Sequence, residues 1–362
     1  MTIIESALWR RIQAGAMAAG PHPTLAVMGM TKNTGKTVAL NHLLAQAAAA
    51  RVAVGMTSIG RDGEAHDQVF LVPKPPIRVW PATLVATARD TLQRAKVRWT
   101  LIDATGIASP MGEILIVRVL EYGEMEVAGA SRSSDQRRVI GRLQHCGAAL
   151  VILDGALGRS QHASPAIASG VILATGAAVG GSMADVIRKT RDRLAILGIA
   201  PADPVHLARC ETVFASGGVG LWNDQGELLF RADIATLNAG ATLLQYLESG
   251  VATIALSGAV GRSVWQALEA LARRRQGLTV VVADATRLFV DQADLLTFGK
   301  LGASLLAFRA ITITGITLNP FSPLGGSFAA AEFLATAQRA FAGYRVSDVM
   351  LEETINKTGV NP

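Results

Sequence analysis

The sequence predicts an α/β protein with a mainly parallel sheet, followed by a C-terminal α/β lobe. Strand-like apolar runs alternate with helix-like segments along most of the chain. The length of 362 residues also exceeds that of a typical compact domain, so two lobes are expected. We place the boundary at the proline-containing stretch 198–204. The expected domains are therefore 1–202 and 203–362, with a hairpin near 219–230 in the second.

The order of elements follows from these runs. The first expected strand, 24–28, is followed by a helix over 36–50. The other strands expected in the first lobe are 51–57, 99–106, 149–159 and 170–175, and the other helices are 82–95, 111–121, 134–146 and 183–197. The prolines between residues 73 and 81 exclude a central strand there, because proline lacks the donor of a strand ladder. In the second lobe the expected strands are 252–258, 278–284, 311–319 and 344–350.

Composition narrows the class of protein. Half of the residues are hydrophobic and 17% are charged, which argues against disorder. The apolar runs are shorter than the roughly 20 residues of a membrane-spanning helix, and the N-terminus lacks the order of a secretory signal. The net charge of +6 is dispersed, and its densest cluster, 273–275, ends a predicted helix, where cations are favourable without a ligand. We therefore expect a cytoplasmic protein that binds neither membrane nor nucleic acid.

A glycine-containing loop follows the first strand. Residues 29–37 read GMTKNTGKT, and Gly35, Lys36 and Thr37 form the G-K-T end of a P-loop directly before a helix. Such a loop wraps phosphates with backbone N–H groups, its lysine reaches the terminal phosphates and its threonine binds Mg²⁺. Met30 occupies the usual position of the first glycine, so either the loop is one residue longer or Met30 tolerates that conformation.

We therefore expect ATP and Mg²⁺ as ligands. The predicted phosphate-binding residues are Met30, Thr31, Lys32, Asn33, Thr34, Gly35, Lys36 and Thr37. Hydrolysis also needs a carboxylate near the ion, commonly at the end of an apolar strand. Asp103 in TLIDATG is the first candidate, and Asp154 in VILDGALG is the alternative. Asp62 in TSIGRDGE is a third acidic residue, expected to face the γ-phosphate after the second strand. Aspartate at a strand end is also a common turn residue, so each has a structural alternative.

The arrangement of Asp103 resembles the magnesium-side strand of the dethiobiotin-synthetase and nitrogenase-iron-protein class of P-loop proteins. A wider set of segments resembles the P-loop subunit of the lysine 5,6-aminomutase reactivase. The segments are GMTKNTGKTVALNHLL, TSIGRDGE, KPPIRVWPATLVATA, LIDATG, LDGALGRSQHASPAIASGVILATGA and LNPFSP. They extend from about residue 24 to 325.

The resemblance implies an ATPase that reactivates an adenosylcobalamin-dependent aminomutase by driving exchange of damaged cobalamin. It implies as partners the aminomutase and a second subunit that resembles the ATPase part of a mismatch-repair protein. It also assigns Lys36 and Thr37 to phosphate and magnesium, and Asp103 to the outer shell of the ion.

Two other functions remain open. The first is a metabolic ligase or kinase of the dethiobiotin-synthetase type, for which Arg61, Arg159 and Lys189 would be cationic substrate anchors. The second is a scaffold that binds nucleotide without hydrolysing it. Steady-state ATP hydrolysis with and without a small acid substrate separates the ligase from the other two.

Overall fold

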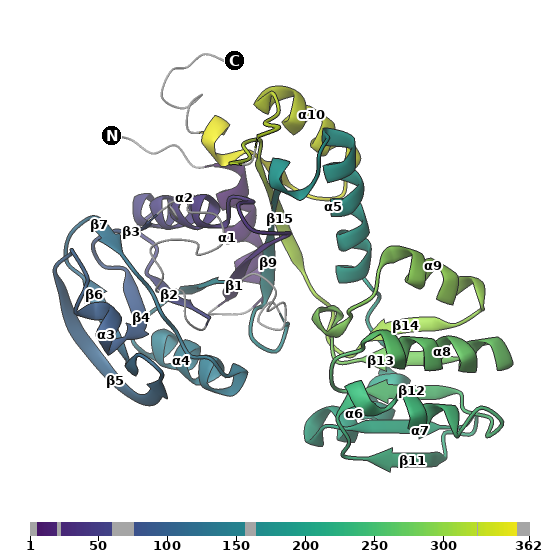
Figure 1. Ribbon diagram of the computed structural model, residues 1–362. Coiled ribbons are helices and arrows are strands. Elements are labelled where there is room, and N and C mark those ends of the chain that lie inside the picture. The colour runs from purple at the N-terminus through teal and green to yellow at the C-terminus, as the bar shows by residue number, and fades with distance from the viewer. Residues whose placement is uncertain (1–5, 20–22, 60–75, 156–163, 324, 353–362) are drawn as a thin grey trace. The chain divides into compact units, whose positions relative to one another are not determined.

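The computed structural model describes residues 6–19, 23–59, 76–155, 164–323 and 325–352. The chain forms two compact α/β units (Figure 1). Unit 1 contains residues 1–190 and 312–362, and unit 2 contains residues 191–311. The predicted domain 203–362 therefore divides, because the strand that begins at Ile313 pairs with a strand of unit 1.

Unit 1 is built on a sheet of nine described strands in the order β16-β15-β9-β1-β8-β2-β4-β6-β5. All neighbours from β16 to β4 pair in parallel, whereas β4, β6 and β5 pair antiparallel. The strands are β1 Thr24–Gly29, β2 Val54–Ser58, β4 Leu84–Ala88, β5 Trp99–Ser109, β6 Gly112–Val119, β8 Leu150–Asp154, β9 Gly170–Gly176, β15 Ile313–Asn319 and β16 Val346–Ser347. The prediction of a mainly parallel α/β sheet is confirmed.

Helices and a short ribbon accompany this sheet. The helices are α1 Ala7–Ala19, α2 Lys36–Ala49, α3 Arg89–Leu92, α4 Ser133–His145 and α10 Ala330–Ala340, and α5 Met183–Leu197 continues into unit 2. Strands β3 Ile77–Val79 and β7 Gly123–Met125 form a separate antiparallel pair. Among the described helices, none is both long and apolar enough to cross a membrane.

Two predicted helices are strands in the structure. The range 82–95 contains β4 and only a four-residue helix, and the range 111–121 contains β6. The segment from Ile114 to Val119 is rich in β-branched residues, which pack well on a pleated surface. Residues Ile114 to Val117 of β6 are buried consecutively, so the strand lacks the simple alternation of buried and exposed residues.

One face of the sheet is covered by α2, and we call it the α2 face. Side chains alternate between the two faces along a strand, and register-paired residues of neighbouring strands share a face. The core against Leu40, Leu43 and Leu44 of α2 contains alternate residues of the central strands. They are Leu25 and Val27 of β1, Ile172 of β9, Leu150 and Ile152 of β8, and Val54 and Met56 of β2. Continuing this alternation places Gly29, Asp154 and Ser58 on the α2 face at the carboxyl ends of β1, β8 and β2.

The opposite face is packed by α4. Leu143 of α4 lies against Gly55 of β2, where a Cβ would be 3.3 Å from the Leu143 Cβ. The buried residues of α4 include Val139, Ile140 and Leu143, at the spacing of one helical stripe. The two helices therefore bury opposite faces of the same central strands, and both begin at the carboxyl ends of the parallel strands.

Unit 2 has a sheet of five described strands in the order β11-β10-β12-β13-β14. The strands are β10 Val219–Trp222, β11 Leu228–Ala232, β12 Thr253–Leu256, β13 Thr279–Val282 and β14 Ser304–Ala307. Its helices are α6 Pro204–Ser216, α7 Gly240–Leu244, α8 Arg262–Arg274 and α9 Gln292–Lys300. Strands β10 and β11 form an antiparallel hairpin where the sequence predicts one, and Gly226 in its turn has φ 82°.

Candidate functional site

The loop between β1 and α2 has the backbone shape of a wrapped turn. Asn33 and Gly35 have φ angles of 61° and 85°, in the left-handed region. Gly35 is the N-cap of α2, which runs for 14 residues and directs its first backbone N–H groups at the loop. The Met30 N–H donates to the Ala174 carbonyl of β9 at 2.9 Å, so the start of the loop is tied to the sheet. This geometry suits a small anion at the end of α2.

The position of the first glycine is resolved by packing. A Cβ on Gly29 would lie 2.7 Å from Thr34 Oγ1 and 2.8 Å from Lys36 Cδ, so the loop folds back over this residue. Met30 is not among the described non-glycine residues with a positive φ. Gly29 is therefore the closely packed glycine at the start of the loop, and Met30 follows it without a left-handed backbone conformation.

Lys36 extends from the first turn of α2 toward the neighbouring strand β8. Its Nζ donates to the Gly155 carbonyl at 3.0 Å, one residue beyond Asp154. Asp154 is 2% exposed and pairs in register with Val27 of β1. A lysine ammonium group, bound to the residue after Asp154, and a buried carboxylate are therefore both at the carboxyl end of the strand pair that carries the loop.

The other loop residues complete the cradle. Thr37 is buried in the first turn of α2, and Thr34 Oγ1 donates to the Thr31 carbonyl at 2.9 Å. Thr31, Lys32 and Met30 are half-buried. The structure thus gathers the predicted residues 30–37 into one turn between a buried strand and a helix.

Asp103 lies far from the loop between β1 and α2. It is on β5, the edge strand, and β8, β2, β4 and β6 separate it from β1. Five strand spacings correspond to about 24 Å. The Arg142 guanidinium donates to Asp103 at 2.6 Å and 2.5 Å, and this hydrogen-bonded pair lowers the pKa of the Asp103 carboxyl. This position does not fit the predicted role at magnesium beside the loop, whereas the alternative candidate, Asp154, ends β8 next to β1.

The other predicted residues either lie outside the described part of the chain or have a partner on their own element. Asp62, Arg61 and Arg159 lie outside the described residues. Lys189, a candidate anchor of the ligase hypothesis, is on α5 and pairs with Asp185 at 2.8 Å. That ion pair accounts for the lysine without a substrate.

Sequence reasoning assigned no role to Asn319, although it quoted the segment LNPFSP. Asn319 ends β15, and its Nδ2 donates to the Asn33 carbonyl at 2.8 Å across 286 residues of sequence. Its Oδ1 accepts from the Phe321 N–H at 3.2 Å. A Cβ on Gly35 would be 3.1 Å from the Asn319 Cβ. Asn319 therefore holds the loop in its left-handed conformation; only an alignment could have signalled this, because the contact is long-range.

Asn319→Ala is expected to destabilise unit 1 by about 0.5–1.5 kcal/mol, the usual net value of a neutral hydrogen bond. Asn319→Asp is expected to do the same, because a carboxylate cannot donate to the Asn33 carbonyl. Urea denaturation followed by circular dichroism measures both changes. Free energies of unfolding equal to that of the unmodified protein would show that the contact contributes nothing.

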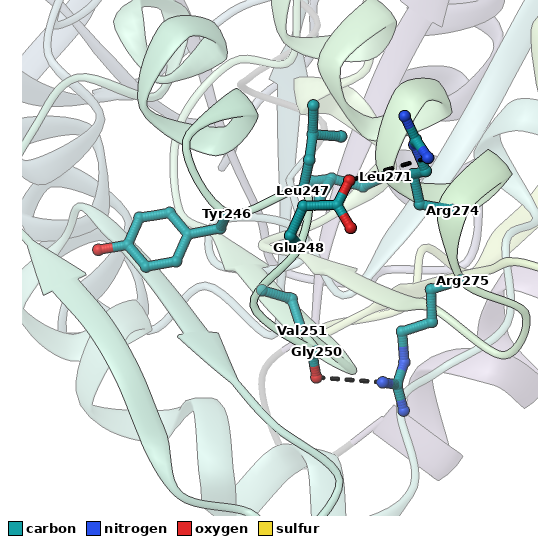
Figure 2. A pocket seen from close by; sticks show the side chains of 8 residues that line it. All are labelled: Tyr246, Leu247, Glu248, Gly250, Val251, Leu271, Arg274 and Arg275. Carbon is teal, nitrogen blue, oxygen red and sulfur yellow. Dashed lines mark hydrogen bonds and ion pairs between the residues drawn. The ribbon is translucent and has the colours of Figure 1, made fainter.

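Unit 2 contains a separate cavity of about 260 Å³ (Figure 2). It is lined by Tyr246, Leu247, Glu248, Gly250, Val251, Leu271, Arg274 and Arg275. Arg274 pairs with Glu248 at 3.8 Å, and Arg275 donates to the Gly250 carbonyl at 3.1 Å and pairs with Asp224. Both guanidinium groups therefore have acidic partners, and the cavity offers no uncompensated charge to define a ligand.

No group of three or more metal-binding side chains occurs among the described residues. The chain matches no protein-family profile, no curated protein and no solved structure. The candidate site is therefore defined by its own geometry, which consists of the loop, Lys36, Thr37 and Asp154.

Proposed function

We propose that the loop binds the phosphates of ATP and that the protein hydrolyses ATP in the presence of Mg²⁺. The observation that carries this proposal is the hydrogen bond from Lys36 to the Gly155 carbonyl, next to the buried Asp154 at the carboxyl ends of β8 and β1, beside a left-handed glycine turn that opens α2. Backbone N–H groups, a helix N-terminus and one lysine favour an anion on one side. A buried carboxylate favours a cation on the other.

The residues present fit a magnesium ion. Thr37 would supply a hydroxyl oxygen and Asp154 a carboxylate oxygen, both of which are hard ligands of the kind that Mg²⁺ prefers. A bound Mg²⁺ would neutralise phosphate charge during transfer. The Lys36 ammonium group would stabilise the terminal phosphates, and residues 30–35 would fix their orientation through the backbone. These contributions are positional and electrostatic, as phosphoryl transfer requires.

By its resemblance, the protein would use this ATPase cycle to reactivate a cobalamin-dependent aminomutase. Two conformations with different affinities for ATP and ADP would supply the free energy that opens the client enzyme. A second subunit resembling the ATPase part of a mismatch-repair protein would act beside it.

Reactivation is tested by mixing an inactivated aminomutase with this protein, its proposed second subunit, ATP, Mg²⁺ and fresh adenosylcobalamin. We expect activity to return with ATP, and at most one round with a non-hydrolysable analogue. Lys36→Ala should fail in the same mixture. Recovery that is independent of ATP would contradict the reactivase hypothesis. ATP hydrolysis that is stimulated by a small acid substrate would favour the ligase instead.

A further inference from the structure

The side chain of Ser58 stands out at the carboxyl end of β2. Its exposed fraction is 0%, and its Oγ makes no hydrogen bond within the described structure. The hydroxyls beside it are used, since Thr57 Oγ1 donates to the Ser58 carbonyl at 3.4 Å and Thr87 Oγ1 accepts from the Ala128 N–H at 2.9 Å. A buried hydroxyl without a partner destabilises the fold, so its presence calls for an explanation other than stability.

The strand register places Ser58 beside Asp154. The two residues are paired in β2 and β8, and both belong to the α2 face. Neighbouring strands are about 4.8 Å apart, so a change of the serine rotamer brings its hydroxyl within reach of the carboxylate. On the other side of Asp154, Lys36 Nζ contacts the Gly155 carbonyl. Ser58 thus lies on the side of the carboxylate away from the loop strand.

A neighbouring segment passes closely over the end of β2. A Cβ on Gly129 would be only 1.8 Å from the Ser58 carbonyl oxygen and 2.8 Å from Thr57 Oγ1. The backbone at Ala128 is held by hydrogen bonds to Ala88 and Thr87 of β4. The end of β2 is therefore closely packed by this segment, and the Ser58 side chain is fully buried.

We propose that Ser58 is a positioning residue for the magnesium site and acts through Asp154. This inference rests on the proposed function. When the cation binds, the Ser58 hydroxyl donates to one oxygen of the Asp154 carboxylate, which leaves the other oxygen oriented toward the ion. No covalent step is involved. The serine thereby lowers the stability of the empty protein and raises its affinity for the cation.

The test measures the affinity of a fluorescent ATP analogue as Mg²⁺ is titrated, together with the melting temperature of the protein without ligand. Losing a partner of a metal-binding carboxylate costs roughly 10- to 100-fold in metal affinity. We therefore expect Ser58→Ala to require roughly 10- to 100-fold more Mg²⁺. Its melting temperature should be equal to or higher than that of the unmodified protein, because the unpartnered hydroxyl is gone.

Two further variants sharpen the result. Ser58→Cys fills the same space with a weak donor, so it should show the same Mg²⁺ requirement as Ser58→Ala without leaving a cavity. Ser347→Ala is the matched control. Ser347 is 1% exposed, its Oγ also lacks a hydrogen bond in the described structure, and it lies in β16 beyond β1, β9 and β15 from Asp154. It should leave the Mg²⁺ requirement unchanged.

The outcomes separate the two proposals. Nucleotide binding by the unmodified protein, with a Mg²⁺ requirement that is the same in Ser58→Ala and Ser347→Ala, would overturn the role of Ser58 alone. Failure of the unmodified protein to bind the analogue at any Mg²⁺ concentration would overturn the proposed function and this inference with it. A fall in melting temperature without a change in Mg²⁺ requirement would make Ser58 a packing residue.

Discussion

Lys36→Ala is expected to abolish tight binding of ATP while leaving the fold intact. A hydrogen bond to a charged group contributes about 1.5–3 kcal/mol, so affinity should fall roughly 10- to 150-fold or more. The fold should survive because Lys36 is only half-buried and its ammonium group donates to a backbone carbonyl in the loop after β8. Isothermal titration calorimetry gives the affinity, and far-ultraviolet circular dichroism checks the fold.

Lys300→Ala is a suitable control for this experiment. Lys300 is an exposed lysine at the last turn of α9 in unit 2, so its removal changes the net charge equally without touching the loop. We expect its affinity for ATP to equal that of the unmodified protein. An unchanged affinity in Lys36→Ala as well would remove the phosphate-binding assignment of the whole loop.

Local sequence was sufficient to predict those elements that are determined by their own residues. The buried strand over 24–28 and the glycine turn before Lys36 identify the loop because strand, turn and helix are consecutive. Strand β5 was predicted, whereas β4 and β6 were predicted as helices. The apolar residues of β4 and β6 are buried consecutively, which removes the period-two pattern that distinguishes a strand from a helix.

The features that were not predicted from the sequence depend on pairing between residues that are far apart in the chain. Whether 311–319 belongs to a second lobe or returns to the first sheet depends on its pairing with β9, which no local pattern contains. The same reason explains the two aspartates. Asp103 and Asp154 both occur in an apolar run followed by glycine, and only the strand order places one at the edge and the other beside β1. The contact from Asn319 to the loop is hidden from sequence for the same reason.

The structure reverses the order of the two magnesium candidates, and this reversal can be measured. Asp154→Asn keeps the size of the side chain and removes its charge, so ATP binding should persist while Mg²⁺-dependent turnover falls. Stabilisation of transferring phosphates by a correctly held metal amounts to several kcal/mol, which corresponds to a loss on the order of 100-fold in kcat. Asp103→Asn should keep turnover close to that of the unmodified protein, because Asp103 is engaged with Arg142 at the sheet edge.

The turnover of the two variants can be compared because Asp103→Asn is expected to change the free energy of unfolding only slightly. Asp103→Asn breaks a partly exposed ion pair, which contributes at most about 1 kcal/mol, so its turnover can be compared under the same conditions. Steady-state phosphate release at saturating ATP, followed over a range of Mg²⁺ concentrations, distinguishes the two residues. If Asp103→Asn is inactive and Asp154→Asn hydrolyses ATP normally, the carboxylate of β8 is not the magnesium ligand. The position of Ser58 beside it would then carry no meaning for catalysis either, because that inference acts entirely through Asp154.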